Sequence, residues 1–368
     1  MARDAAIGSA LARLRRAAAA ESVRRAVAAR GAVRLMEVCG GQTRTIVRSG
    51  LESLLPEGVA FAHGPGCPVC VTDGAFLRAA GEAALGPERP VVCTYGDLMR
   101  VPDSRGRSLA EVRAAGGDVR VMSSPLEAVR TAEAERGRSV ILLAIGFETT
   151  APANALALAA AVAKKLDNFR MASAQFLLPP VLRTLFGKGA GEARPDALLA
   201  PGHVAAVLGE APFRALAEEL GLPIVVAGFT EEELLRAAAT ALEAVAEGRE
   251  GFFANEYAKA VAPAGNPAAK AAMEKMFAPC ERVWRGLGTI PASGLAPREA
   301  FAAWTADFAV APDAEESKGG NPCRAGEVLR GLCRPDACPA FGTACTPSHP
   351  LGAGMVSPEG ACAAYFRA

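Results

Sequence analysis

Two motifs that mark nucleotide-binding sites are missing from this chain of 368 residues. The chain contains neither the Gly-x-x-x-x-Gly-Lys-Ser/Thr pattern of a phosphate-binding loop nor the Gly-x-Gly-x-x-Gly pattern of a dinucleotide-binding fold. It also lacks a Cys-x-x-x-Cys-x-x-Cys pattern, which would indicate radical chemistry with S-adenosylmethionine. These absences argue against the commonest nucleotide-binding classes and against the usual radical enzymes.

The chain also has little net charge, few aromatic residues and no long apolar run. Lys plus Arg is 40 and Asp plus Glu is 39, and aromatic residues make up 5% of the chain. No basic surface with interleaved aromatic side chains is therefore expected, and nothing indicates a nucleic-acid partner. Runs such as residues 153–163 are too short to span a bilayer, and the charged N-terminus lacks the apolar segment of a secretory signal. We expect a cytoplasmic protein with neither a nucleic-acid nor a membrane partner.

The chain is rich in short apolar runs that alternate with helical segments. Hydrophobic residues make up 51% of the sequence, which is typical of a globular protein. Strands that alternate with helices predict parallel sheets and an α/β fold, and two sets of four strands indicate two similar halves. The expected strands are Val33–Val38, Val59–Ala62, Pro90–Thr94, Val119–Met122, Ser139–Ile145, Phe169–Ala174, Ala197–Ala200 and Pro223–Ala227.

These patterns predict four parts of the chain. Residues 1–30 form an N-terminal helix that we expect to pack on the C-terminal domain. Residues 31–125 form a first parallel-sheet α/β domain, and residues 126–248 form a second, similar one. Residues 249–368 form a loop-rich, mainly helical C-terminal domain, rich in Gly, Pro and Cys towards its end, that something other than apolar burial holds together.

A Cys-x-x-Cys pair lies on a turn shaped by glycine and proline, in the stretch Gly64-Pro65-Gly66-Cys67-Pro68-Val69-Cys70. Gly permits the backbone angles of a tight turn and Pro fixes φ, so the turn is expected to hold both thiols close together and near the surface. Such a pair can have a lowered thiol pKa, which makes one sulfur a nucleophile or a metal ligand. The alternative is two cysteines that are buried only for packing.

Five of the ten cysteines lie between residue 323 and the C-terminus. Four thiolates on a loop-rich tail suit an iron–sulfur cluster or a structural zinc. Zinc sites usually have paired Cys-x(2–4)-Cys segments, and the only short gap is from Cys333 to Cys338, so the spacing favours a cluster. Zinc and disulfides stay open, and Cys333 is a fifth candidate. The four predicted ligands are Cys323, Cys338, Cys345 and Cys362.

Other candidate residues share a position in the predicted fold. Cys39, Glu148 and His203 follow the carboxyl ends of predicted strands, as the Cys-x-x-Cys pair does. In open α/β sheets ligands bind beyond these ends, so we expect these residues to face one cleft. Each also has a simpler interpretation. Cys39 can be an ordinary strand-end residue, Glu148 a first-turn residue favoured by the helix dipole, and His203 a hydrogen-bonded turn residue.

Several motifs occur together and in one order along nearly the whole chain. Met36–Thr43 contains Cys39, His63–Thr72 contains the Cys-x-x-Cys pair, and Gly146–Pro152 contains Glu148. Pro201-Gly202-His203-Val204 and Trp284-Arg285-Gly286-Leu287-Gly288 follow, and the tail from Gly326 to Cys362 fits as well. With these motifs the chain resembles the HypD family of hydrogenase maturation proteins.

The resemblance implies a fold of two α/β domains and a third domain that holds a [4Fe-4S] cluster. It implies assembly of the Fe(CN)2CO unit of [NiFe]-hydrogenases in the cytoplasm, with a HypC-type chaperone and with cyanide from HypE and HypF. By matching motif, Cys39 would bind the iron of this unit, and Cys67 and Cys70 would form a redox-active dithiol. The tail ligands would be Cys323, Cys338, Cys345 and Cys362, and Glu148 and His203 are the other catalytic candidates.

Two other functions stay open on the residues alone. A general thiol–disulfide oxidoreductase would need only the Cys-x-x-Cys pair, and a zinc-stabilised binding module would need only the tail cysteines. Whether the protein is an enzyme also stays open, because a scaffold and redox maturation factor could have oxidoreductase-type activity.

Overall fold

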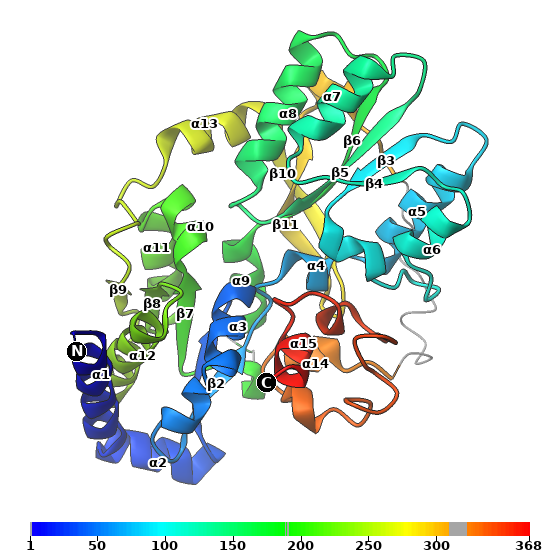
Figure 1. The fold of residues 1–368 in the computed structure, drawn as a ribbon. Helices are drawn as coiled ribbons and strands as arrows, with labels where there is room; N and C mark the ends of the chain where they lie inside the picture. Colours follow the sequence, from blue (N-terminus) through cyan, green and yellow to red (C-terminus); the bar gives the residue numbers. More distant parts are fainter. Residues whose placement is uncertain (1, 188, 190, 309–321) are drawn as a thin grey trace.

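The computed structural model describes residues 2–187, 189, 191–308 and 322–368, and two β-sheets form its frame (Figure 1). The first sheet has the strand order β2-β1-β7-β8-β9, and all its pairings are parallel. The predicted α/β fold with mostly parallel sheets is confirmed. The strands of the first sheet are β1 (Val33–Glu37), β2 (Val59–His63), β7 (Ala197–Pro201), β8 (Ile224–Ala227) and β9 (Phe253–Asn255).

The second sheet has the order β10-β11-β6-β5-β3-β4, with an antiparallel hairpin at one edge. All residues of its central strand β5 are buried, as expected for a strand with helices on both faces of the sheet. Its strands are β3 (Val91–Thr94), β4 (Val119–Val121), β5 (Val140–Gly146), β6 (Phe169–Phe176), β10 (Phe277–Trp284) and β11 (Gly288–Pro297).

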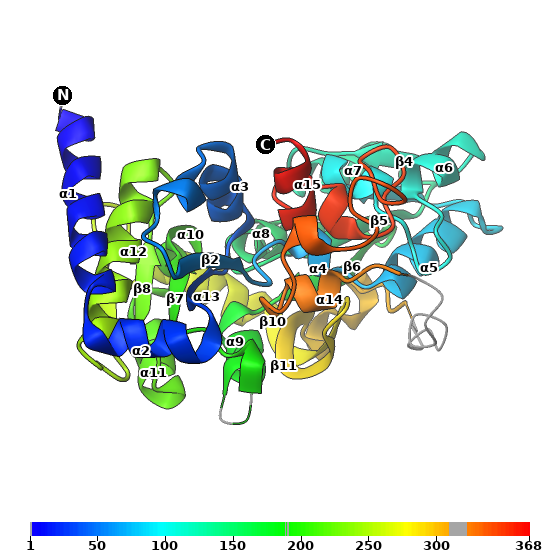
Figure 2. The same cartoon turned by 90° about the horizontal axis from the view of Figure 1, so that it is seen from below.

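Helices cover both faces of both sheets (Figures 1 and 2). On the first sheet these are α1 (Ala2–Ala18), α2 (Glu21–Arg30), α3 (Gly40–Arg48) and α12 (Glu231–Ala246) on one face, and α9 (Leu178–Phe186), α10 (Gly202–Leu208) and α11 (Ala211–Leu220) on the other. On the second sheet they are α5 (Gly74–Leu85) and α6 (Leu109–Ala114) on one face, and α7 (Leu126–Ala134), α8 (Ala151–Ala163) and α13 (Pro267–Met276) on the other. The short helix α4 (Pro68–Val71) packs against β5.

The sheets do not follow the predicted boundaries at residues 125 and 126. Strand β3, which was assigned to the first domain together with its partner β4, pairs with β5, and β7 pairs with β1. Each sheet is therefore built from separate stretches of chain. The prediction was wrong here because hydrophobic periodicity locates a strand, whereas a parallel partner can lie across a crossover of any length.

The N-terminal segment also differs from its prediction. It forms two helices, α1 and α2, and α1 packs on α12 of the first sheet rather than on the C-terminal domain. Leu14 is fully buried there, and the guanidinium of Arg13 donates to Glu243 at 2.9 Å and to Thr240 at 2.8 Å. An apolar stripe on a helix shows that the helix is covered, but it does not identify the surface that covers it.

Residues 249–308 belong to the sheets rather than to a helical third domain. Strand β9 extends the first sheet, and the β10–β11 hairpin extends the second. Among the described residues, 322–368 form the loop-rich tail, with α14 (Ala325–Val328) and α15 (Ala361–Phe366), and this tail packs against α3 and α4 (Figures 1 and 2). None of the described helices is both long and apolar enough to cross a membrane.

Candidate functional site

Cys39 occupies the point where β1 ends and α3 begins. Its backbone is extended, with φ −151° and ψ 120°, and its carbonyl accepts the N–H groups of Gln42 at 2.9 Å and Thr43 at 3.0 Å. Burial, and secondarily the carboxylates of Glu37 and Glu359, raise the pKa of the Cys39 thiol to about 12. The thiol therefore keeps its proton at neutral pH, and a metal that binds the sulfur would displace that proton.

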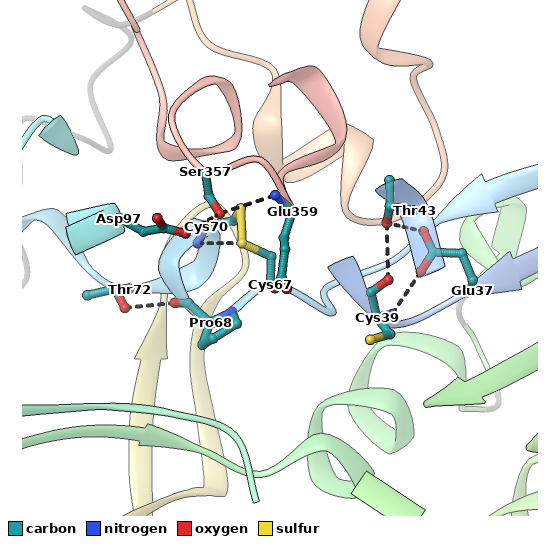
Figure 3. The surroundings of a disulfide bond; sticks show 10 residues. All are labelled: Glu37, Cys39, Thr43, Cys67, Pro68, Cys70, Thr72, Asp97, Ser357 and Glu359. Atoms are coloured by element: carbon teal, nitrogen blue, oxygen red, sulfur yellow. Dashed lines mark hydrogen bonds between the residues drawn. A yellow bond between two sulfur atoms is a disulfide. The ribbon is translucent and has the colours of Figure 1, made fainter. Parts of the chain in front are cut away.

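Glu37 anchors this strand end from inside the protein. It is fully buried, and its carboxylate accepts the backbone N–H of Cys39 at 2.8 Å and the hydroxyl of Thr43 at 2.5 Å (Figure 3). Nδ1 of His63, at the end of β2, lies 2.7 Å from the same carboxylate. A buried polar group needs such partners, and here they join the ends of the neighbouring strands β1 and β2 next to Cys39.

The same hydrogen-bonded chain continues into the tail. Nε2 of His63 lies 2.9 Å from the hydroxyl of Tyr365, which is in α15. That hydroxyl donates to Glu52 at 2.6 Å. The tail is thus hydrogen-bonded to the strand ends that position Cys39.

Cys67 and Cys70 are joined as a disulfide, with their Cα atoms 5.2 Å apart (Figure 3). Cys67 caps the short helix α4, which begins at Pro68 and contains Cys70, and the N–H of Cys70 donates to the sulfur of Cys67 at 3.2 Å. Only 3% of Cys67 and 4% of Cys70 is exposed. The predicted turn is present, but its position near the surface was wrong, because the tail covers it.

The disulfide loop touches Cys39 through its backbone. The N–H of Gly40 donates to the carbonyl of Gly66 at 3.1 Å, and a Cβ on Gly66 would lie 2.1 Å from the nitrogen of Cys39. Figure 3 shows the sulfur of Cys39 well separated from the disulfide. Gly66 is therefore required, because only glycine lets the two backbones approach so closely. This contact holds the disulfide loop next to Cys39.

A small cavity separates the disulfide from the tail. Cys67, Cys70 and Cys362 all line it, together with Gly40 and Gly354. The disulfide consequently faces one of the four predicted tail ligands, although the two are separated by almost 300 residues of sequence.

The four tail cysteines lie close enough that a negative charge on one sulfur raises the thiol pKa of another. Cys338, Cys345 and Cys362 share one small apolar cluster. Burial raises the pKa of the Cys323 thiol and that of the Cys362 thiol, and negative charge on other tail sulfurs acts in the same direction. Together these effects bring the pKa of Cys362 to about 12. No group of three or more His, Cys, Asp or Glu side chains in the described ranges is arranged as a metal site.

Comparison with known proteins identifies the family. Residues 15–368 match the HypD family model, described as "Hydrogenase formation hypA family". The chain belongs to the HypD family. "Hydrogenase maturation factor HypD" of Rhizobium leguminosarum bv. viciae is 43% identical over 336 residues, which cover 90% of this chain and 87% of the relative. The corresponding protein of Escherichia coli (strain K12) is 39% identical over 338 residues, which cover 91% and 89%.

His203 lies near the Cys39 turn of this HypD family member, on the other side of Phe229. It is exposed in the first turn of α10, and its ring stacks on that of Phe229 with centroids 3.8 Å apart. A Cβ on Gly41 would lie 3.3 Å from the ring of Phe229 and 3.8 Å from the sulfur of Cys39. Although the residue as a whole is exposed, desolvation of its stacked ring lowers the pKa of His203.

Glu148 follows a strand of the other sheet. One carboxylate oxygen accepts the N–H of Leu178 at 2.9 Å, and the other has no hydrogen-bond partner among the described residues. Burial raises the pKa of Glu148 to about 7. Its strand packs against α4, but none of the described hydrogen bonds links its side chain to the cysteines.

The sequence interpretation assigned no role to the polar residues that support the HypD motifs. Gln42 is fully buried and donates to the carbonyls of Ala227 at 3.0 Å and Gly228 at 3.2 Å, which fixes α3 to the end of β8. Glu37 was detectable as a charged residue inside the apolar stretch Val33–Val38. Nothing in the local sequence identifies the role of Tyr365, because its partners lie about 300 residues away.

Proposed function

We propose that this chain is a hydrogenase maturation factor on which the Fe(CN)2CO unit of [NiFe]-hydrogenases is assembled in the cytoplasm. In this role it works with a HypC-type chaperone and receives cyanide groups from HypE, which acts with HypF. The names of the relatives, hydrogenase maturation factor HypD, support this assignment.

The observation that carries the proposal is the position of Cys39 against the disulfide loop. A thiol at the carboxyl end of a parallel strand occupies the usual ligand-binding edge of an α/β sheet. Its backbone is fixed on one side by Glu37 and on the other by the close contact with Gly66. Such a fixed sulfur can hold a labile iron unit in one orientation during successive additions.

Cys39 binds the iron of the substrate unit in this proposal. A thiolate is a soft ligand that suits low-valent iron, and binding replaces the proton that burial keeps on the sulfur. An open cavity of about 640 Å³ lies over Gly41 between α3 and the start of α12, lined by Arg44, Arg48 and Phe229 among others. This opening is where a chaperone that shares the iron would approach.

Cys67 and Cys70 act as the redox-active pair. Reduction of their disulfide takes up two electrons and two protons, breaks the S–S bond and leaves two thiols. The tail covers the pair, so small external thiols have little access to it. That protection favours a dedicated internal electron path over general disulfide exchange.

Cys323, Cys338, Cys345 and Cys362 are the residues that would hold the [4Fe-4S] cluster. Their chemistry fits, since four thiols share one tail, and glycine is found where a side chain would crowd the sulfurs. A Cβ on Gly352 would lie 2.4 Å from the sulfur of Cys323. When bound, a cluster supplies single electrons.

Anaerobic co-purification with a HypC-type chaperone tests the assignment. We expect infrared bands of iron-bound CN and CO on the wild-type complex and their loss in Cys39→Ala, with the broad absorbance near 400 nm kept. Cys280→Ala is the matched control, because Cys280 lies in the β10–β11 hairpin, away from Cys39. Bands that persist in Cys39→Ala would disprove the scaffold role.

Metal analysis of the same preparations separates the remaining alternatives. About four irons per chain support the proposal, whereas one zinc and no colour would support a zinc-stabilised module. Fast turnover of unrelated disulfides would support a general oxidoreductase instead.

A further inference from the structure

A cavity of about 740 Å³ lies at the surface between the tail and the loop that leads into α6. Residues between 100 and 108 line one side of it, and residues 347–351 of the tail line the other. Neither Cys39 nor the Cys67–Cys70 pair is among the described residues that line it. The cavity is therefore separate from the site described above.

The tail side of this cavity is a thin wall over two of the candidate cluster ligands. Leu351 lines the cavity, and its backbone N–H donates to the sulfur of Cys345 at 3.4 Å. The next residue is Gly352, on which a Cβ would lie 2.4 Å from the sulfur of Cys323. Cys362 lines the small cavity beside the disulfide. The tail cysteines therefore extend from the wall of the surface cavity to the disulfide.

Positive charge gathers on the other side of the surface cavity. Residues 100–113 include four arginines and two carboxylates, whereas residues 337–358 of the tail include no Asp, Glu, Lys or Arg. Arg100 and Arg105 both line the cavity and are exposed. Arg100 forms no ion pair within the part of the chain that the structure describes. Arg105 has an exposed contact of 3.5 Å with Glu82, which neutralises little of its charge.

The two carboxylates of this segment are occupied by hydrogen bonds within their own loop. Asp103 accepts the backbone N–H groups of Arg105 at 2.8 Å and Arg107 at 2.9 Å. Glu111 accepts the N–H of Ser108 at 2.8 Å and its hydroxyl at 2.7 Å. The arginines are therefore the charged groups of this segment that are available to a partner.

The loop that carries these arginines is held from behind. The guanidinium of Arg285 donates to the carbonyl of Pro102 at 2.7 Å, and the backbone N–H of Arg285 donates to the carbonyl of Val71 at 2.8 Å. The guanidinium of Arg78, in α5, donates to the hydroxyl of Ser104 at 3.1 Å. A fixed loop presents its charges without a further cost of ordering when a partner binds.

We propose that this cavity is the docking site of a small acidic electron-carrier protein, which delivers single electrons to the tail. The inference rests on the proposed function, because it assumes that the tail cysteines hold a cluster. Cationic side chains around a docking site attract an acidic partner and orient it. The thin wall at Leu351 gives such a partner a short path to the tail sulfurs, which favours an electron carrier over other acidic proteins.

The electrons balance in this scheme. Each encounter oxidises the carrier by one electron and breaks no bond. Two electrons, together with two protons from water, convert the Cys67–Cys70 disulfide to two thiols.

The test uses the full chain, purified without oxygen and supplied with iron and sulfide, and a plant-type [2Fe-2S] ferredoxin as the acidic carrier. Calorimetry at about 50 mM and about 200 mM NaCl measures the affinity between the two proteins. We expect Arg100→Gln/Arg105→Gln to lower the affinity about tenfold at the lower salt concentration and Arg100→Gln alone to lower it about threefold. Both variants should show a weaker dependence on salt and should retain as much iron as the wild type.

Two control variants separate the position of the charges from their number. Arg100→Lys/Arg105→Lys keeps both charges and should bind the ferredoxin as the wild type does. Arg15→Gln/Arg16→Gln removes two exposed charges from α1, which packs on the first sheet, and should leave the affinity unchanged.

A second measurement follows the disulfide itself. Alkylation of Cys67 and Cys70, counted by mass spectrometry, reports how fast the reduced ferredoxin opens the disulfide. The rate should fall about tenfold in Arg100→Gln/Arg105→Gln. Photoreduced deazariboflavin, which is uncharged and needs no docking site, should open the disulfide equally fast in the wild type and in this variant.

The outcomes distinguish the inference from the proposed function. Wild-type affinity in whichever neutral variant folds would overturn this docking site, and so would an equal loss of affinity in Arg15→Gln/Arg16→Gln. A wild-type chain that holds its full complement of iron but does not bind the ferredoxin would overturn the inference and leave the proposed function standing. A wild-type chain that binds no cluster would overturn both.

Discussion

The hydroxyl of Tyr365 lies 2.9 Å from Nε2 of His63 and so joins the C-terminal helix to the strand end beneath Cys39. Through His63 this contact reaches Glu37, whose carboxylate holds the backbone of Cys39. The covering tail and the candidate iron ligand are therefore parts of one hydrogen-bonded structure. Loss of order in the tail should also loosen Cys39.

Tyr365→Phe should lower the free energy of unfolding by about 1 kcal/mol, because it leaves the buried ring nitrogen of His63 without a partner. The ring itself should keep its edge contact with His63, whose centroid lies 5.4 Å away. Urea unfolding measures the loss. Tyr95→Phe is the matched control, since its hydroxyl makes one longer bond of 3.3 Å to Asn154. Equal losses in the two variants would contradict a special role for the tail contact.

Gly66→Ala should be among the most damaging single changes in the chain. The new Cβ would lie 2.1 Å from the nitrogen of Cys39 and 2.2 Å from the carbonyl carbon of Val38, and both are backbone atoms that cannot rotate away. We expect a loss of roughly 3–5 kcal/mol in unfolding free energy and faster alkylation of Cys39 by iodoacetamide.

Gly96→Ala is the control for this change, because its Cβ would meet only a methyl group of Val121 at 3.6 Å. It should unfold like the wild type, within about 1 kcal/mol. If Gly66→Ala is equally mild, then the disulfide loop and the Cys39 turn are not in the close contact described above.

The positions of the candidate site residues could be predicted from the sequence where the signal, an apolar run followed by a turn, was local. Cys39 and the Cys67–Cys70 pair follow apolar runs that do form parallel strands, and the carboxyl ends of those strands do meet at one edge of the first sheet. The Cys39 turn contacts the Cys67–Cys70 loop through its backbone and lies near His203 through Phe229, and that these residues face one cleft stays a prediction. The prediction was not correct for Glu148, because β5 belongs to the other sheet.

What could not be predicted depends on contacts between distant segments. The pairing of β1 with β7 and the cover that the tail places over the disulfide join residues that are far apart in sequence. Periodicity and spacing report on a window of a few residues and carry no information about such partners. The buried network of Glu37, His63 and Tyr365 is of this kind, because each residue alone has an ordinary sequence setting.

Glu148 should make stability depend on pH. Burial raises the pKa of its carboxyl from 4.5 to about 7, so the folded state prefers the neutral form. This preference favours folding fully below pH 4.5 and is lost as the pH rises to 7, where the unfolded chain binds fewer protons than the folded chain. The wild-type unfolding free energy should therefore fall between pH 5 and pH 8, by up to about 3 kcal/mol from this group.

Glu148→Gln tests that slope, because the amide oxygen can still accept the N–H of Leu178 and carries no titrating proton. The variant should lose this part of the pH dependence and should be more stable than the wild type at pH 8. Urea unfolding at pH 5, 6.5 and 8 measures the difference between the two proteins. Identical slopes would show that Glu148 is not a neutral buried acid.

Gly352→Ala should reduce metal binding by the tail, if the tail cysteines hold a cluster as proposed. The added Cβ would lie 2.4 Å from the sulfur of Cys323, which must then move away from the other three thiols. We expect iron retention during anaerobic gel filtration to fall by at least about tenfold, the size typical of a disturbed ligand environment. Gly137→Ala has open space around its Cβ and should retain as much iron as the wild type. Equal retention by both variants would mean that Cys323 is not a ligand or that its loop rearranges when iron binds, and iron analysis of Cys323→Ser would separate these two explanations.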